Sequence, residues 1–339
     1  MPEPPVDLAK VPYVASVPDP AEIRLTWSDG AYSLGLVAAA AVLIGFPGAI
    51  FNGTFTSNYN RIMRFGAAWR RRKRIALPGW ARLALGILAS ATISTLARPG
   101  LGFGAQTLVV LLAGAVASLV ASMLVEMPMW LHMRSRTGYQ RTVRLYPGGF
   151  VIALAFALLT WIAELQPGYI YGTLVGMAYL DLDRKDAVLH GKFTAIGYAV
   201  AASVGFAAWF LRTPFNARLA ADPASVPLLA ITVCLGALFV TCVQSAVFAL
   251  MPLKFMSGKD ILTWSRAGWA ALQFTLAVGF AYIFLSPATP RGSSAEKILP
   301  AAVLFVSFAL FSFAFWGYFR WRPTPPEQPE PARADVRDR

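Results

Sequence analysis

The chain has 339 residues, of which 57% are hydrophobic and only 14% are charged. A soluble domain carries about 25% charged residues, so this composition excludes an ordinary soluble enzyme or binding domain. The net charge of +13 comes mostly from Arg residues beside apolar runs, which favours contact with a membrane surface and gives no reason to expect nucleic acid as a partner. We expect an all-α fold, a polytopic transmembrane helical bundle.

The N-terminal segment, residues 1–27, is rich in proline and carries charges of both signs. We expect a mobile tail here, ahead of a transmembrane domain over residues 28–319. The segment has neither the basic start nor the apolar core of a secretory signal peptide, so the first span is expected to act as the targeting signal. The C-terminal segment 320–339 is also Pro-rich and charged, and is expected to be disordered.

Apolar runs between these segments approach the ~20 residues that a helix needs to cross ~30 Å of hydrocarbon. They lie at 31–51, 80–97, 105–125, 150–163, 169–180, 193–211, 226–251, 269–285 and 298–319. The run at 169–180 is short, so it predicts either a short fifth crossing or a re-entrant segment, for a total of 8–9 spans. The positive-inside rule favours nine, with the N-terminus outside and the C-terminus in the cytoplasm of a cell membrane.

Basic residues gather in two segments expected at the cytoplasmic surface, 52–82 and 127–147. In the first, Phe55, Tyr59, Ile62 and Trp69 recur at helical spacing. The basic residues around them are Arg61, Arg64, Arg70, Arg71, Arg72, Lys73 and Arg74. This pattern predicts an interfacial helix that binds anionic phospholipid, and a docked protein partner at the same face is also expected. The alternative is a basic loop that only fixes the topology.

A broken element follows the run at 150–163 and reads Gln166-Pro-Gly-Tyr-Ile-Tyr-Gly172. A proline leaves a backbone carbonyl without its helical partner, and glycine permits a turn. Such backbone at membrane depth must lie against protein or water. Glu164, Pro167, Tyr169 and Tyr171 are therefore candidates either for helix packing or for a substrate site, since transporters bind their substrates at discontinuous helices.

Acidic residues and one of the two histidines cluster next, at Asp181, Asp183, Asp186 and His190. Carboxylate and imidazole groups together can hold a divalent metal. Arg184 and Lys185 lie in the same stretch and favour an ion-paired, solvated loop instead. No cofactor, no metal and no catalytic residue is predicted from this pattern.

The polar residues expected in mid-span are uncharged, at Thr241, Gln244, Ser245 and Gln273. Proton and ion paths need ionisable groups at membrane depth, so these residues are expected to join helices. The favoured hypothesis is a non-enzymatic scaffold or docking component with a basic cytoplasmic face. A transporter or channel with its site at 164–180 is the second hypothesis, and a membrane enzyme acting on a lipid-linked substrate is the third.

Three separated motifs resemble a poorly characterised family of actinobacterial multi-pass proteins named for an FGLLP motif. They are Phe248-Ala-Leu-Met-Pro252 with the residues that follow to Trp269, Phe51-Asn52-x-Thr54 with Asn58-Tyr59, and the broken element at 166–172. Ala249 and Met251 depart from the Gly and Leu of the family motif. The resemblance implies a multi-pass membrane fold and no particular activity.

Overall fold

The computed structural model describes residues 8, 11, 13–65, 78–96, 105–134, 141–145, 150, 153–154, 157–158, 160, 175–179, 184–253, 256–286 and 294–322. The helices are η2 (Pro20–Glu22), α1 (Trp27–Ser57), α2 (Tyr59–Phe65), α4 (Gly79–Leu96), α5 (Ala105–Met133), α7 (Arg184–Ala221), α8 (Val226–Ala249), α9 (Ser257–Trp264), α10 (Arg266–Leu285) and α11 (Ser294–Trp321). The strands are β1 (Arg141–Leu145) and β2 (Val175–Tyr179).

Six of these helices, α1, α5, α7, α8, α10 and α11, are long and apolar enough to cross a membrane. They indicate an integral, multi-pass membrane protein, and the predicted helical bundle is confirmed. Each of the six falls on a predicted span, as does α4, whose apolar part is shorter. The span predicted at 150–163 is described only in part, and the total of 8–9 spans stays a prediction.

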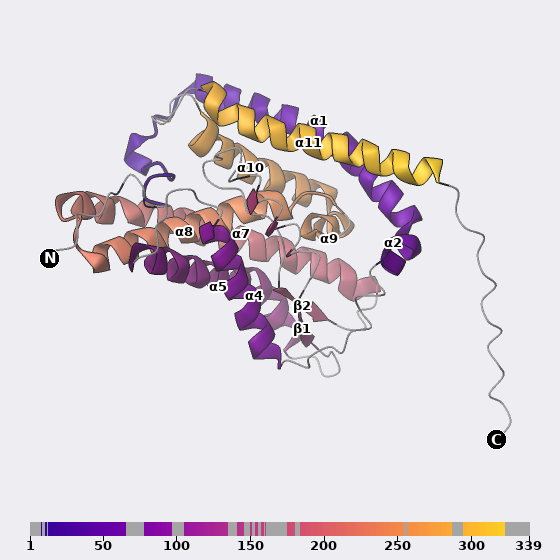
Figure 1. Ribbon diagram of the computed structural model, residues 1–339, viewed down its shortest axis with the longest axis horizontal. Coiled ribbons are helices and arrows are strands. Elements are labelled where there is room, and N and C mark those ends of the chain that lie inside the picture. The colour runs from indigo at the N-terminus through magenta and orange to yellow at the C-terminus, as the bar shows by residue number, and fades with distance from the viewer. Residues whose placement is uncertain are drawn as a thin grey trace.

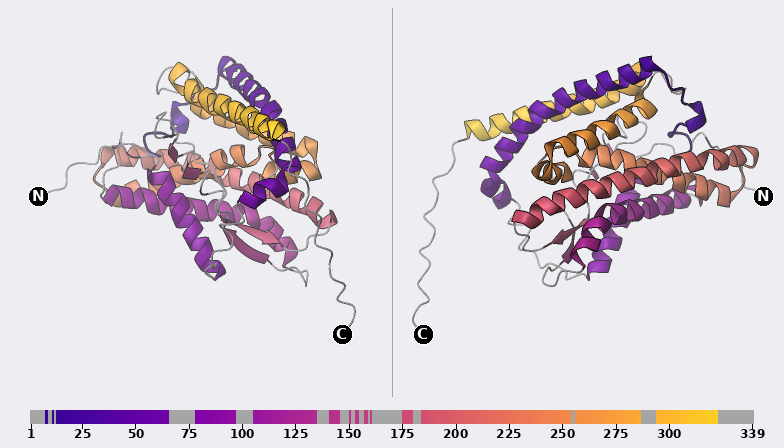
Figure 2. Two further views of the ribbon diagram at one scale, coloured as in Figure 1. Left: turned by 45° about the vertical axis from the view of Figure 1, so that its right-hand side comes forward. Right: turned by 180° about the vertical axis from the view of Figure 1, so that it is seen from behind.

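The bundle is built in layers (Figure 1). The helices α5, α7 and α8 pack against one another, and α10 lies on α7 and α8. The first and last long helices, α1 and α11, lie side by side on the other side of α10, as both further views also show (Figure 2). Aromatic rings fill the centre: Trp209 stacks on Phe239 with ring centres 5.3 Å apart, and Phe239 stacks on Phe284 at 5.9 Å.

Glycines on α7 allow its backbone to approach α5 and α8 closely. A Cβ atom at Gly197 would lie 2.1 Å from the carbonyl oxygen of Val125, and one at Gly205 would lie 2.8 Å from the Cβ of Cys242. Between helices in lipid, such van der Waals packing replaces the hydrophobic effect as the main attraction. Hydrogen bonds add to it, because Gln273 of α10 donates through Nε2 to the carbonyl of Val247 at 3.2 Å.

Residues 13–26, which we call the strap, lie across one end of the bundle. Val11, Tyr13 and Val17 belong to the main core and are only 1%, 4% and 0% exposed. The prediction of a mobile tail over 1–27 is therefore wrong for this described part. Composition alone suggested disorder. However, the prolines reduce the entropy that the chain loses on ordering, and the apolar side chains between the prolines pack against the helices.

A two-stranded antiparallel ladder accompanies the helices. Arg141 of β1 lies opposite Tyr179 of β2, and Leu145 opposite Val175. Residues 169–180 are predicted to be either a short fifth crossing or a re-entrant segment of a helical bundle. Within this range residues 175–179 form a strand, and not a helix, and the backbone groups of this strand pair with β1. The predicted basic segment 127–147 contains two different elements. Its first residues belong to α5, which continues to Met133, and residues 141–145 form β1.

Candidate functional site

Hydrogen bonds between distant residues bring several helix ends to one end of the bundle. Asn52 of α1 donates through Nδ2 to the carbonyl of Pro252, just after α8, at 2.9 Å. Arg61 of α2 donates through Nη1 to the carbonyl of Arg322, just after α11, at 3.3 Å. Figure 1 shows α2, α9 and the last turns of α11 at this end, opposite the strap.

Positive side chains gather there, and we call it the basic end. Its described cations are Arg61, Arg134, Lys192, Lys259, Arg266, Arg320 and Arg322, and all but the half-buried Arg61 are exposed. At the strap end the described cations Arg24, Arg212 and Arg218 are accompanied by Asp19, Glu22, Asp29 and Asp222. The described acidic residues near the basic end are Asp260 of α9 and Glu126 of α5, so cations outnumber carboxylates at the basic end but not at the strap end.

Arginines and aromatic rings alternate around the last turns of α11. The guanidinium carbon of Arg61 lies 5.2 Å from the ring centre of Phe319. Arg320 lies over Trp316 at 5.4 Å, and Arg322 lies over Tyr318 at 4.8 Å. Each such contact stabilises the arrangement by about 0.5–1 kcal/mol at an exposed site. Trp, Tyr and Arg together are typical of the boundary between hydrocarbon and water.

Only part of the predicted lipid-binding set can be placed. Arg61 lies at the basic end, and Arg64 is part of α2, although its side chain lies outside the described residues. Trp69 and residues 70–74 lie outside the described chain altogether. The same is true of the candidates in the broken element, which are Glu164, Pro167, Tyr169 and Tyr171.

Sequence reasoning missed the aromatic and basic end of α11. The signal was present, because Trp316, Tyr318 and Trp321 lie within a few residues of Arg320 and Arg322. The sequence predicts a disordered tail from residue 320 onward, whereas α11 continues to Trp321. Residues 323–339 lie outside the part of the chain that the structure describes.

The histidine of the predicted metal cluster pairs with a different carboxylate. Nδ1 of His190 lies 3.9 Å from Oδ2 of Asp260, which belongs to α9. No group of three or more His, Cys, Asp or Glu that could hold a metal occurs among the described residues. Asp181, Asp183 and the side chain of Asp186 lie outside them, so the metal hypothesis for those residues is untested.

This pair lies where α7 and α9 touch. A Cβ atom at Gly191 would lie 2.2 Å from the carbonyl oxygen of Asp260, so the two backbones are in direct contact. About two turns further along α7, Tyr198 makes a 3.1 Å hydrogen bond to Ser257 of α9. Burial raises the pKa of Asp260, although the charges of His190 and Lys259 act to lower it.

At the opposite end, one arginine holds the strap. Arg212 is 1% exposed, and its Nη2 donates to the carbonyls of Val17 at 3.0 Å and Val14 at 3.3 Å. Nearby, Asp19 accepts from Thr213 Oγ1 at 2.9 Å and from Asn216 Nδ2 at 2.8 Å.

Burial acts to raise the pKa of Asp19, but hydrogen bonds from Asn216, the Ala21 amide and Thr213, together with the charge of Arg212, outweigh it and hold the pKa below its usual value. This arrangement is a structural attachment between the strap and α7. The basic end remains the better candidate for binding. The chain matches no protein-family model, no curated protein and no solved structure.

Proposed function

We propose that this protein is a non-enzymatic docking component of the cell membrane, whose basic end binds anionic phospholipid and holds a protein partner at the cytoplasmic surface. The observation that carries the proposal is the grouping of exposed Arg and Lys side chains with interfacial aromatic rings at one end of the bundle. Near an anionic membrane surface each basic residue contributes about 1 kcal/mol of attraction. Several such residues on one rigid end can hold it against the headgroups.

The proposed orientation follows from the same asymmetry. Short cytoplasmic segments of membrane proteins carry an excess of Lys and Arg, so the basic end faces the cytoplasm and the strap lies outside. The chain then has its N-terminus outside and its C-terminus inside. The resemblance to the FGLLP-motif family supports a multi-pass membrane protein and adds no activity.

The interior of the bundle supports docking over transport. Trp209, Phe239 and Phe284 stack across its centre, and Gln273 forms a hydrogen bond to the neighbouring helix. These side chains fill space and join helices. A transport path would instead place ionisable groups beside water at mid-membrane.

Hydrogen–deuterium exchange of the full-length protein in nanodiscs tests the proposal. Amides of residues 55–75 should exchange more slowly in phosphatidylglycerol than in phosphatidylcholine, and salt should reduce the difference by screening. A variant with Gln at residues 70–74 should lose this protection, whereas the Arg24→Gln/Arg218→Gln variant, changed at the strap end, should keep it. Equal exchange of the unaltered protein in both lipids would contradict the lipid-binding role.

A transporter is the second candidate, and one observation favours it. Glu126 of α5 and Asp260 of α9 are half-buried and lie near Tyr198 of α7, and His190 lies beside Asp260. Ionisable groups shared by three helices near a membrane boundary are a common feature of proton-coupled carriers. The predicted substrate site of this candidate is the broken element at 164–180, of which residues 175–179 form β2 and the rest lies outside the described residues.

A further inference from the structure

Four side chains on one face of α7 hold the strap by hydrogen bonds. They follow helical spacing and are Trp209, Arg212, Thr213 and Asn216. Nε1 of Trp209 donates to the carbonyl oxygen of Pro18 at 2.8 Å, next to the carbonyls that Arg212 binds. Trp209 and Arg212 are both almost fully buried. A row of donors with fixed positions therefore faces one segment of the chain.

The strap has the conformation of a polyproline II helix at this point. Asp19 has a φ of −76° and a ψ of 142°, close to the polyproline II values of about −75° and 145°. Pro18 and Pro20 on either side favour this conformation, because proline fixes its own φ and restricts the residue before it. Such a segment has no internal hydrogen bonds and leaves its carbonyl groups free to accept. Aromatic-lined grooves recognise proline-rich segments of this kind in several domain families.

The contacts with α7 define which features of the strap are recognised. Three acceptors are carbonyl oxygens, of Val14, Val17 and Pro18, and any extended segment would offer them. The other described acceptor is the carboxylate of Asp19, whose two oxygens accept from Thr213 and Asn216 at 2.9 Å and 2.8 Å. The site therefore selects an extended chain that carries a carboxylate between two prolines.

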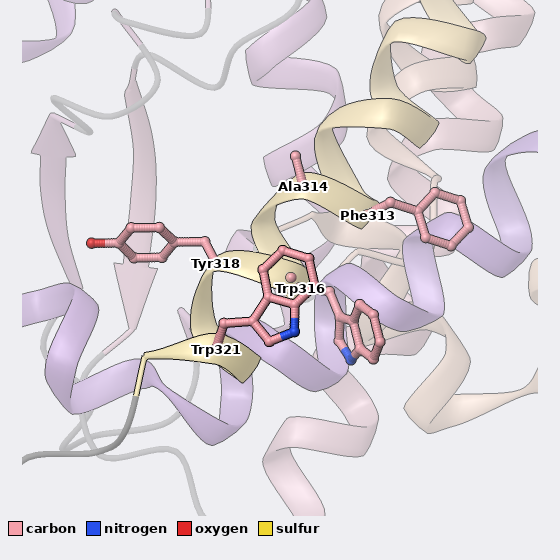
Figure 3. A pocket seen from close by; sticks show the side chains of 6 residues that line it. Phe313, Ala314, Trp316, Tyr318 and Trp321 are labelled. Atoms are coloured by element: carbon pink, nitrogen blue, oxygen red, sulfur yellow. The ribbon is translucent and has the colours of Figure 1, made fainter.

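The exposed groove on α11 is a surface of a different kind. Its described lining residues all belong to that helix and are Phe313, Ala314, Trp316, Gly317, Tyr318 and Trp321. Figure 3 shows Trp316 and Tyr318 pointing to opposite sides of α11. An open apolar surface suits the tails of surrounding lipids, whereas the buried donors of α7 fit one polar chain.

We propose that this face of α7 is a binding site for an extended proline–aspartate–proline segment of a partner protein, and that the strap occupies it as a built-in competitor. The site lies at the end of the bundle opposite the basic end, so the inference goes beyond the proposed function. A partner segment of the same chemistry would supply Arg212 with the same carbonyl acceptors as the strap. Exchange of one segment for the other therefore leaves this buried charge solvated by hydrogen bonds.

One residue of the strap weakens its hold on the site. Tyr13 has a φ of 66°, a left-handed conformation that is strained for a bulky side chain. Its backbone lies tightly against α8, where a Cβ at Gly236 would be 3.0 Å from the carbonyl oxygen of Tyr13. The strap gains a high effective concentration from its covalent link to α1, and the strain at Tyr13 offsets part of this advantage. A partner segment without a left-handed residue avoids the strain.

A fluorescent peptide of residues 11–22, added to the full-length protein in nanodiscs, tests the inference. Both sides of a nanodisc are open to solution, so the test does not depend on the orientation of the chain. Asp19→Ala removes the carboxylate of the strap and leaves the donors of α7 unchanged. The peptide should bind this variant at least ~10-fold more tightly than the unaltered protein, because the competing strap has lost two charge-assisted hydrogen bonds. Asp222→Ala, which removes an exposed carboxylate from the same end of the bundle, should bind the peptide as the unaltered protein does.

Two further variants, each made in the Asp19→Ala protein, locate the bound peptide. Asn216→Ala and Thr213→Val each remove one donor to the carboxylate and should weaken binding by about 10-fold. Both should affect a peptide with Asn in place of Asp19 much less, because a hydrogen bond to a neutral amide is weaker than one to a carboxylate. This comparison separates a direct contact from a general disturbance of α7.

Three results would overturn the inference. The first is that the peptide does not bind the Asp19→Ala variant, and the second is that the α7 variants weaken both peptides equally. The third is a dimer of the unaltered protein, seen by native mass spectrometry, in which cysteines at Asp19 and Asn216 crosslink different copies. That result would assign the site to the strap of a second copy and not to a partner protein.

Discussion

Nη2 of Arg212 donates a hydrogen bond to the carbonyl oxygen of Val17, 3.0 Å away and 195 residues earlier in the chain. The arginine is almost fully buried, and a buried charge is tolerated only when hydrogen bonds replace its lost hydration. The strap supplies these acceptors as backbone carbonyls. The strap and the end of α7 therefore depend on each other for stability.

Replacing Arg212 with Met should loosen the strap. The carbonyls of Val14 and Val17 would lose their donor while remaining shielded from water, at a cost of about 2–4 kcal/mol. We expect a lower midpoint of thermal unfolding in detergent and faster proteolysis within residues 13–26. Arg218→Met, at an exposed position of the same helix, should change the midpoint little. Equal midpoints for the two variants would contradict a structural role for Arg212.

Acid should also release the strap, because the pKa of Asp19 is lower in the folded protein than its usual value. A carboxyl of this kind stabilises the folded state above the unfolded pKa of about 3.9 and loses that contribution as pH falls through the folded pKa. Proteolysis of the strap by an acid-active protease should therefore accelerate below about pH 4. Asp19→Asn should reduce this pH dependence, and an identical profile in both proteins would show that another group is responsible.

Adding a methyl group at Gly197 should separate α5 from α7. The new Cβ would lie 2.1 Å from the Val125 carbonyl oxygen, which is backbone and cannot rotate away. Overpacking of this kind typically costs about 1–3 kcal/mol, so Gly197→Ala should unfold at lower temperature. Gly279→Ala is the matched control, since its Cβ would meet Phe206 at an ordinary 3.5 Å. If both variants unfold at the same temperature, the close approach of the two backbones is wrong.

Reporter fusions should reveal the orientation of the chain. A fusion at Lys185, at the start of α7, and one after Arg322 should both report cytoplasm, whereas a fusion before Ala31 should report the outside. Short cytoplasmic segments of membrane proteins carry an excess of Lys and Arg, so we expect the basic end to face the cytoplasm. Readings outside the cell for Lys185 and Arg322 would favour eight crossings over nine.

Cysteine labelling should separate docking from transport. A cysteine placed at Tyr169 or Tyr171 should react slowly with a water-soluble thiol reagent from either side, because irregular backbone in a docking protein is expected to pack against protein. The buried Cys242 and the partly exposed Cys234 should first be replaced with Ser or Ala so that only the new thiol is measured. Rapid labelling from both sides would place water beside this element and favour the transporter.

The long helices could be predicted because runs of ~20 apolar residues have few other stable structures. The strand at 175–179 could not, since a five-residue apolar run is ambiguous between helix and strand until its partner is known. The pair of His190 and Asp260 was missed for a related reason: 70 positions separate them, and only the contact between α7 and α9 brings them together. In the strap, composition predicted disorder, but hydrogen-bond donors on α7, about 195 positions away in the sequence, hold its carbonyl and carboxylate groups in place.

The pairing of α1 with α11 also has a consequence for biosynthesis. Phe51 of α1 packs among aromatic rings of α11, with the ring of Phe315 5.2 Å away. About 240 residues separate Ser57 from Ser294, so at ~5–20 residues per second α1 is in the membrane for roughly 10–50 s before its partner is made. Until α10 is made, shortly before α11, α1 must be stable without either of the long helices that it packs against. A ribosome that stops before α11 leaves the first helix of the protein without its main neighbour.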